Sequence, residues 1–273
     1  MNIGIFDSGI GGMTLLHQAL VLLPNEDYIF YADTDHVPYG TKSKETVMGY
    51  VDEVMRFMVA NDCKAVVIAC NTATAVAVEA MREKYSIPII GIEPAVKPAV
   101  ENCQGKRVLV VATPLSVKEV RLQRLVERVD DDHLVDLQAL PGLVEFAERG
   151  EFESEDVRNY LREQFAPYDL INYKELVLGC THFNYFKDIF RTIIPKDMSI
   201  VDGSLGTVKQ LARVLDEKGQ LNTKPIDESK AIYNFDIGDG NVKYYRSGRA
   251  ITDNAELEYM KMLHKRLEKM RLL

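Results

Sequence analysis

Two short apolar runs that each end in a cysteine constrain the fold of this chain more than any other feature. One run covers residues 65–70 and ends at Cys70, and the other covers residues 176–180 and ends at Cys180. Small polar residues follow each cysteine, and then a segment that favours a helix. This pattern predicts a buried parallel strand that leads into a helix. Because ligands bind at the carboxyl ends of such strands, we expect both cysteines at a ligand site.

Alternating strand and helix patterns surround the two runs and divide the chain into two similar halves. The loop at Asp7 in the first half corresponds to the loop at Thr113 in the second. We therefore predict an α/β fold with two similar doubly wound domains, mainly parallel sheets and an active site in the cleft between them. The first domain is expected to comprise residues 1–97 plus 208–273, completed by the C-terminal tail, and the second residues 98–207.

Local sequence patterns predict several further helices and strands. Residues 116–129 are expected to form one helix that begins with a capping box of Ser116 and Glu119. A second helix is expected to run from Cys180 to about residue 194. In the tail, residues 231–237 and 242–246 suggest a hairpin, followed by an amphipathic helix over residues 256–271.

Composition excludes several classes of function. The 273 residues carry a net charge of −8, which disfavours bulk electrostatic binding to nucleic acid. No apolar run approaches the length of a membrane span, and the N-terminus does not resemble a signal peptide, so we expect a cytoplasmic protein. The four cysteines form no C-x-x-C pair, and no Walker or dinucleotide motif is present, so neither a metal nor a cofactor is expected. The oligomeric state is left open, with a homodimer as one candidate.

Two further loops carry candidate site residues. The Gly-rich loop over residues 7–12 follows the first predicted strand, and it could bind an anion through backbone N–H groups or form a turn that needs positive φ. Within it, Asp7 would suit a ligand that carries an ammonium group beside its carboxylates. The loop Pro38-Tyr39-Gly40 follows the second strand, where it could hold a ligand or place Tyr39 as a lid on the core.

Two acid/base groups on opposite sides of a substrate could remove a proton from one face and return it to the other, as a racemase requires. Helix N-termini and neighbouring cations lower a thiol pKa, and both cysteines are expected just before a helix. His182 could assist Cys180, and Asp7 could assist Cys70 as a proton acceptor or an orienting group. Two other readings stay open: a cysteine hydrolase or transferase that uses Cys180 and His182, and a solute-binding protein without catalysis.

A set of motifs over residues 3–203 resembles cofactor-independent glutamate racemase, of the aspartate/glutamate racemase family. The motifs are Asp7-Ser8-Gly9-x-Gly11-Gly12, Pro38-Tyr39-Gly40, Cys70-Asn71-Thr72-Ala73-Thr74, Glu93-Pro94-Ala95 and Gly179-Cys180-Thr181-His182-Phe183. The resemblance implies interconversion of L- and D-glutamate, with D-glutamate supplied for peptidoglycan synthesis. Aspartate racemases are the nearest alternative, but they often carry Glu after the second Cys-Thr, where this chain has His182.

The resemblance also implies roles for individual residues. Cys70 would act on D-glutamate and Cys180 on L-glutamate, assisted by Asp7 and His182. The expected substrate-binding residues are Asp7, Ser8, Tyr39, Gly40, Asn71, Thr72, Thr181 and His182, with Glu148 and Thr113 as further candidates. The chain departs from the family pattern in the segment 113–116, which is usually richer in threonine, and at Asn184, where proline is usual.

Overall fold

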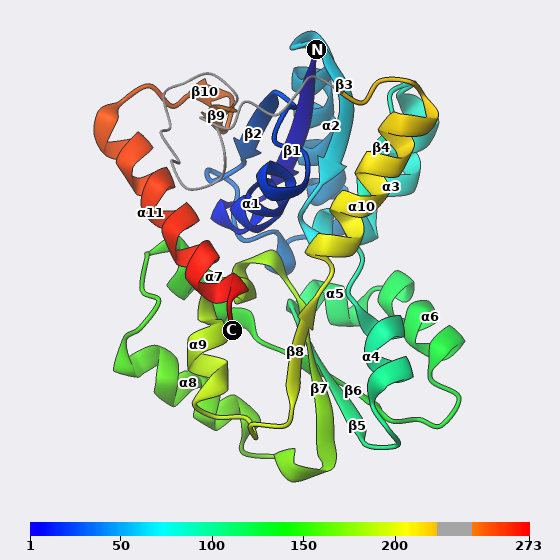
Figure 1. Cartoon of the computed structure of the whole chain (residues 1–273), viewed down its shortest axis with the longest axis vertical. Helices are drawn as coiled ribbons and strands as arrows, with labels where there is room; N and C mark the ends of the chain where they lie inside the picture. Colours follow the sequence, from blue (N-terminus) through cyan, green and yellow to red (C-terminus); the bar gives the residue numbers. More distant parts are fainter. Residues whose placement is uncertain (223–241) are drawn as a thin grey trace.

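The computed structural model describes residues 1–222 and 242–273, which form two α/β lobes stacked along the long axis of the molecule (Figure 1). The fold class is therefore as predicted. The first lobe contains the N-terminus, and the second lobe contains the middle of the chain. The exact division at residues 97 and 207 stays a prediction.

The sheet of the first lobe has six strands in the order β10-β9-β2-β1-β3-β4. The strands are β1 (Asn2–Asp7), β2 (Tyr28–Ala32), β3 (Cys63–Ile68), β4 (Ile89–Gly91), β9 (Val242–Arg246) and β10 (Arg249–Ala250). All neighbours are parallel except β9 and β10. Because β9 pairs with β2, the C-terminal tail extends the first sheet. Parallel pairing places the carboxyl ends of β1, β2 and β3 at one edge, which faces the second lobe (Figure 1).

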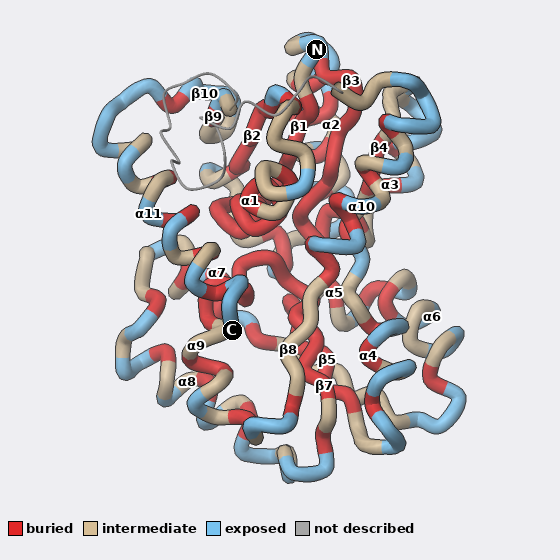
Figure 2. The backbone as a smooth tube through the Cα atoms, in the orientation of Figure 1, coloured by how far each residue is buried: buried red, intermediate tan, exposed pale blue. Residues whose placement is uncertain are grey.

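The sheet of the second lobe has four parallel strands in the order β6-β5-β7-β8. They are β5 (Arg107–Ala112), β6 (Val135–Ala139), β7 (Tyr173–Gly179) and β8 (Ser199–Asp202). The inner strands of both sheets are buried on both faces (Figure 2), which explains their nearly continuous apolar sequences. One apolar cluster includes Phe30 of the first lobe and Phe183 of the second, so the lobes share part of their core.

Helices cover both sheets. In the first lobe they are η1 (Ile10–Gly12), α1 (Met13–Leu22), η2 (Tyr39–Thr41), α2 (Lys44–Ala60), α3 (Asn71–Lys84), α10 (Ser204–Glu217) and α11 (Asn254–Arg271). In the second lobe they are α4 (Val96–Asn102), α5 (Pro114–Lys118), α6 (Val120–Val129), α7 (Pro141–Glu148), α8 (Glu155–Phe165), η3 (Leu170–Asn172), η4 (Thr181–Phe186) and α9 (Lys187–Arg191). Among the residues described, no helix is long and apolar enough to cross a membrane.

Three local predictions were wrong. The single helix over 116–129 is two helices, because Glu119 is extended and its buried carboxylate pairs with Lys44 of α2 at 3.0 Å. The cap of α5 is Thr113, which accepts from the Ser116 N–H, and not Ser116 itself. The helix predicted after Cys180 is a 3-10 helix, η4, followed by the short α9.

The prediction for the tail has a mixed outcome. Residues 231–237 lie outside the described residues, and residues 242–246 form β9 as predicted, paired with β10. The C-terminal helix α11 begins two residues earlier than predicted, where Asp253 accepts from two backbone N–H groups and so caps it. Helix α4 was not predicted, since Pro98 within it obscures the helical pattern.

Candidate active site

Both cysteines line one narrow cavity between the lobes. Its lining residues are Ser8, Pro38, Tyr39, Gly40, Cys70, Asn71, Thr72, Thr113, Val144, Cys180, Thr181 and His182. The free volume of this cavity is only about 10 Å³, so the site is closed in this structure. Nearly all the residues predicted for the site therefore meet at one place. Pro38 and Val144 were not predicted, because an apolar side chain gives no chemical signal in a sequence.

Cys70 lies at the N-terminus of α3 in the first lobe. Its Sγ accepts from the Ala73 N–H at 3.4 Å and donates to Ser8 Oγ at 3.6 Å. Burial raises the pKa of Cys70 to about 12, with a smaller contribution from the negative charge of Asp7. The N–H contact at the helix N-terminus lowers this pKa, as predicted, but desolvation outweighs it and the net shift is upward.

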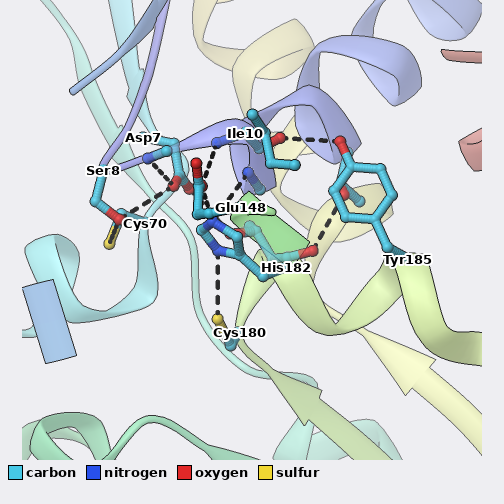
Figure 3. Close-up of polar contacts among 12 residues, drawn as sticks. Asp7, Ser8, Ile10, Cys70, Glu148, Cys180, His182 and Tyr185 are labelled. Carbon is cyan, nitrogen blue, oxygen red and sulfur yellow. Dashed lines mark hydrogen bonds and ion pairs between the residues drawn. The ribbon is translucent and has the colours of Figure 1, made fainter. Parts of the chain in front are cut away.

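Asp7 ends β1 and is completely buried. Its Oδ1 accepts from the Gly9 N–H at 3.0 Å and from Ser8 Oγ at 3.3 Å. Its Oδ2 accepts from Thr181 Oγ1 of the second lobe at 2.9 Å. Burial raises the pKa of Asp7, and the nearby His182 opposes this rise. Cys70, Ser8 and Asp7 thus form a hydrogen-bonded chain that leads from the thiol to a carboxylate (Figure 3).

Cys180 has a different chain of partners in the second lobe (Figure 3). Its Sγ lies 3.7 Å from Nδ1 of His182, whose Nε2 lies 2.7 Å from Oε1 of Glu148. Burial by itself lowers the pKa of His182, but hydrogen bonds to Cys180 and Glu148 and their charges raise it well above its ordinary value. The direction of this shift favours the imidazolium form of His182, in which an Nδ1–H faces the sulfur of Cys180.

Comparison with known proteins identifies the family of this chain. The family model described as Asp/Glu/Hydantoin racemase matches residues 14–211. The chain belongs to this racemase family. A glutamate racemase of Lachnospira eligens is 52% identical over 99% of both chains, and glutamate racemase 2 of Bacillus subtilis is 46% identical over 98% of this chain and 97% of its own. A crystal structure of Francisella tularensis glutamate racemase with D-glutamate has a TM-score of 0.77 at 28% identity, covering 96% of this chain and 93% of its own.

In the Gly-rich loop of this racemase the glycines do not serve a turn with positive φ, and the backbone N–H groups bind side chains of the protein. Within the described part of the chain, none of the glycines at 9, 11 and 12 has positive φ. The N–H groups of Gly9, Ile10 and Gly11 point at Asp7, Glu148 and His182 of the protein itself. A Cβ on Gly9 would overlap Glu148, and one on Gly11 would overlap Thr181 and His182. The glycines therefore let the second lobe approach the loop closely.

Hydroxyl groups from both lobes meet at another wall of the racemase cavity. Thr72 Oγ1 of α3 lies 2.9 Å from Thr113 Oγ1 and 3.2 Å from Ser116 Oγ, and Thr113 donates to Ser116 at 2.9 Å. The departure from the family at residues 113–116 thus keeps a hydroxyl at each end of the segment. Asn71 Oδ1 is buried beside them without a hydrogen-bond partner in the described residues, which leaves an acceptor for a ligand N–H.

Tyr39 is buried in the racemase cavity wall, and its hydroxyl donates to Asp33 Oδ2 at 2.6 Å. Asp33 also accepts from Ser247 Oγ and lies within 3.0 Å of His36 Nδ1. Asp33 was missed as a supporting residue, although its position directly after β2 is the same signal that identified Cys70. Gly40 packs against Thr113, so the loop 38–40 also contacts the second lobe.

Proposed function

We propose that this racemase interconverts L- and D-glutamate without a cofactor, with Cys70 and Cys180 as the two bases. The observation that carries the proposal is that thiols from separate lobes line one cavity. Relatives that share about half of the sequence are named glutamate racemase, which supports glutamate as the substrate. Following the family pattern, Cys70 takes the α-proton of D-glutamate and Cys180 that of L-glutamate. The other thiol then donates a proton to the opposite face.

Each thiol has its own path for moving a proton. Ser8 connects Cys70 to Asp7, and burial makes the Asp7 carboxylate a better proton acceptor by raising its pKa. On the other side, the His182 imidazolium faces Cys180 and is held by Glu148. Because burial raises the pKa of Cys70 to about 12, loss of its proton needs a compensating positive charge. The substrate ammonium supplies the positive charge that favours this step.

Polar groups of the cavity match the polar groups of glutamate. Asn71 Oδ1 accepts from the ammonium, near the carboxylate of Asp7. The hydroxyls of Ser8, Thr72, Thr113 and Thr181, together with the backbone of the 39–40 loop, bind the two carboxylates. The cavity in this structure is narrower than glutamate, so its walls must move to admit the substrate. Since this enzyme would make D-glutamate, we also propose a role in peptidoglycan synthesis in the cytoplasm.

Hydrogen exchange in D₂O tests the proposal. We expect either enantiomer of glutamate to acquire deuterium at Cα as it is converted to the other. Proton NMR measures the exchange at Cα, and circular dichroism measures the conversion. Aspartate, assayed in parallel, should be turned over far more slowly. Binding of glutamate without any exchange would instead identify a solute-binding protein, and turnover of aspartate alone would identify an aspartate racemase.

The variant Glu148→Gln tests whether activity needs the protonated form of His182. Glutamine keeps the carbonyl oxygen that accepts from Ile10 and His182, but it removes the negative charge that helps to raise the pKa of His182. Activity that needs the imidazolium is lost as pH rises through this pKa, so the basic limb of kcat/KM should move to lower pH. We expect about tenfold lower activity above neutral pH. Glu145→Gln, an exposed change on the same helix, should leave the profile unchanged, and an unchanged profile in Glu148→Gln would exclude this role.

A further inference from the structure

The C-terminal helix α11 contacts both lobes. It begins beside the first sheet and runs down to α9 of the second lobe (Figure 1). In the first lobe, Glu268 lies 2.9 Å from His17 of α1. The side chain of Arg266 is only 9% exposed, and it contacts Tyr185 and Asp188 of the second lobe. The family motifs end at residue 203, so none of them assigns a purpose to this helix.

Arg266 holds η4 through several contacts at once. Its Nε donates to the carbonyl of Tyr185 at 2.9 Å, and its Nη2 donates to both carboxylate oxygens of Asp188 at 3.1 Å. Its Nη1 donates to Glu153 at 2.7 Å, and the guanidinium lies 4.8 Å from the centre of the Phe152 ring. A 3-10 helix of six residues is longer than such helices usually are, and it needs support from its surroundings.

Tyr185 connects this support to the reacting groups. In a 3-10 helix, residues three apart lie on the same side, so Tyr185 and His182 both face the Gly-rich loop. The Tyr185 hydroxyl donates to the carbonyl of Ile10 at 3.0 Å, while the Ile10 N–H donates to Glu148, the partner of His182 (Figure 3). The ring is completely buried, so this hydroxyl has a fixed position.

We propose that Arg266 and Tyr185 are positioning residues for the Cys180 half of the reaction. They fix η4 and the Ile10 backbone so that His182 stays aligned between Cys180 and Glu148. In the described part of the chain neither residue hydrogen-bonds to Cys70, Ser8 or Asp7, and η4 contacts that half of the site through the single bond from Thr181 to Asp7. Their loss should therefore slow proton abstraction by Cys180 more than abstraction by Cys70. This inference rests on the proposed two-thiol function.

Elimination of HCl from the two enantiomers of a single diastereomer of 3-chloroglutamate separates the half-reactions. One base removes the α-proton, the C–Cl bond breaks, chloride leaves, and the enamine takes up water to give 2-oxoglutarate and ammonium. Only the abstracting thiol is needed, so the L-configured substrate reports on Cys180 and the D-configured one on Cys70. The product 2-oxoglutarate is measured by its reduction with NADH and glutamate dehydrogenase.

The variants are Arg266→Lys, Arg266→Met and Tyr185→Phe. We expect each to slow elimination from the L substrate by about tenfold and to leave the D substrate within about twofold. Tyr185→Phe removes a single oxygen, so it tests the idea even if the Arg266 variants fold poorly. Lys269→Met is the matched control, because this exposed residue lies near the same Glu153 and Asp188 carboxylates, and it should change neither rate.

The rates of the variants test the positioning role, and the rates of the unmodified enzyme test the two-thiol function. Equal slowing of both substrates, or no slowing, would mean that Arg266 and Tyr185 have only a structural role, and the inference would be overturned. If the unmodified enzyme eliminated HCl from only one enantiomer, or from neither, the proposed two-thiol function would fail, and this inference with it.

Discussion

Alanine at either Cys70 or Cys180 is expected to lower the rate of glutamate racemisation by at least about 10³-fold. Every turnover needs one of these thiols as the base and the other as the acid. The two thiols come from different lobes and line the same cavity, so neither can replace the other. The rate of change in circular dichroism, started from each enantiomer, measures the loss. Both variants should keep the unfolding temperature of the unmodified protein within a few degrees.

Cys103→Ala is the matched control for these substitutions. Cys103 is as buried as the two site cysteines, but it lies in a separate apolar cluster of the second lobe. We expect this variant to keep its activity. Full activity of Cys70→Ala would exclude the two-base scheme and would favour a hydrolase or transferase in which Cys180 acts alone with His182.

The strands and their carboxyl ends could be predicted from the sequence, because an uninterrupted apolar run has few ways to be buried. Residues that follow β1, β2, β3 and β7 meet at the site for the same reason. The predicted pairing of Cys180 with His182 also depended only on their separation of two residues. Local patterns were therefore sufficient wherever the chain itself fixes the geometry.

Predictions failed where contacts between the lobes decide the result. The break at Glu119 depends on Lys44, which lies 75 residues earlier in the sequence (119 − 44 = 75). The raised pKa of Cys70 depends on its complete burial, which the sequence around it does not give. Tyr185 of η4 accepts from Arg266 and donates to Ile10, two partners far away in the sequence. Local propensity is weak when such long-range contacts oppose it.

The purpose of the Gly-rich loop also depends on contacts between the lobes. Gly11 is buried against η4, and an added Cβ would lie 2.7 Å from Cε1 of His182 and closer still to Thr181. Neither neighbour can move freely, because Glu148 holds His182 and Asp7 holds Thr181. Gly11→Ala must therefore push η4 away from the loop and misalign His182 with Cys180.

We expect Gly11→Ala to reduce kcat/KM by about 10²-fold, since a displacement of about 1 Å at reacting groups has an effect of this size. Overpacking should also lower the free energy of unfolding by about 1–3 kcal/mol, measured by urea denaturation. Gly206→Ala is the control, because nothing lies within 4 Å of its Cβ position in the exposed part of α10. That variant should be fully active and slightly more stable, as alanine favours a helix. A normal kcat/KM for Gly11→Ala would show that catalysis does not require close contact between the loop and η4. The alignment of His182 would then depend on Glu148 alone.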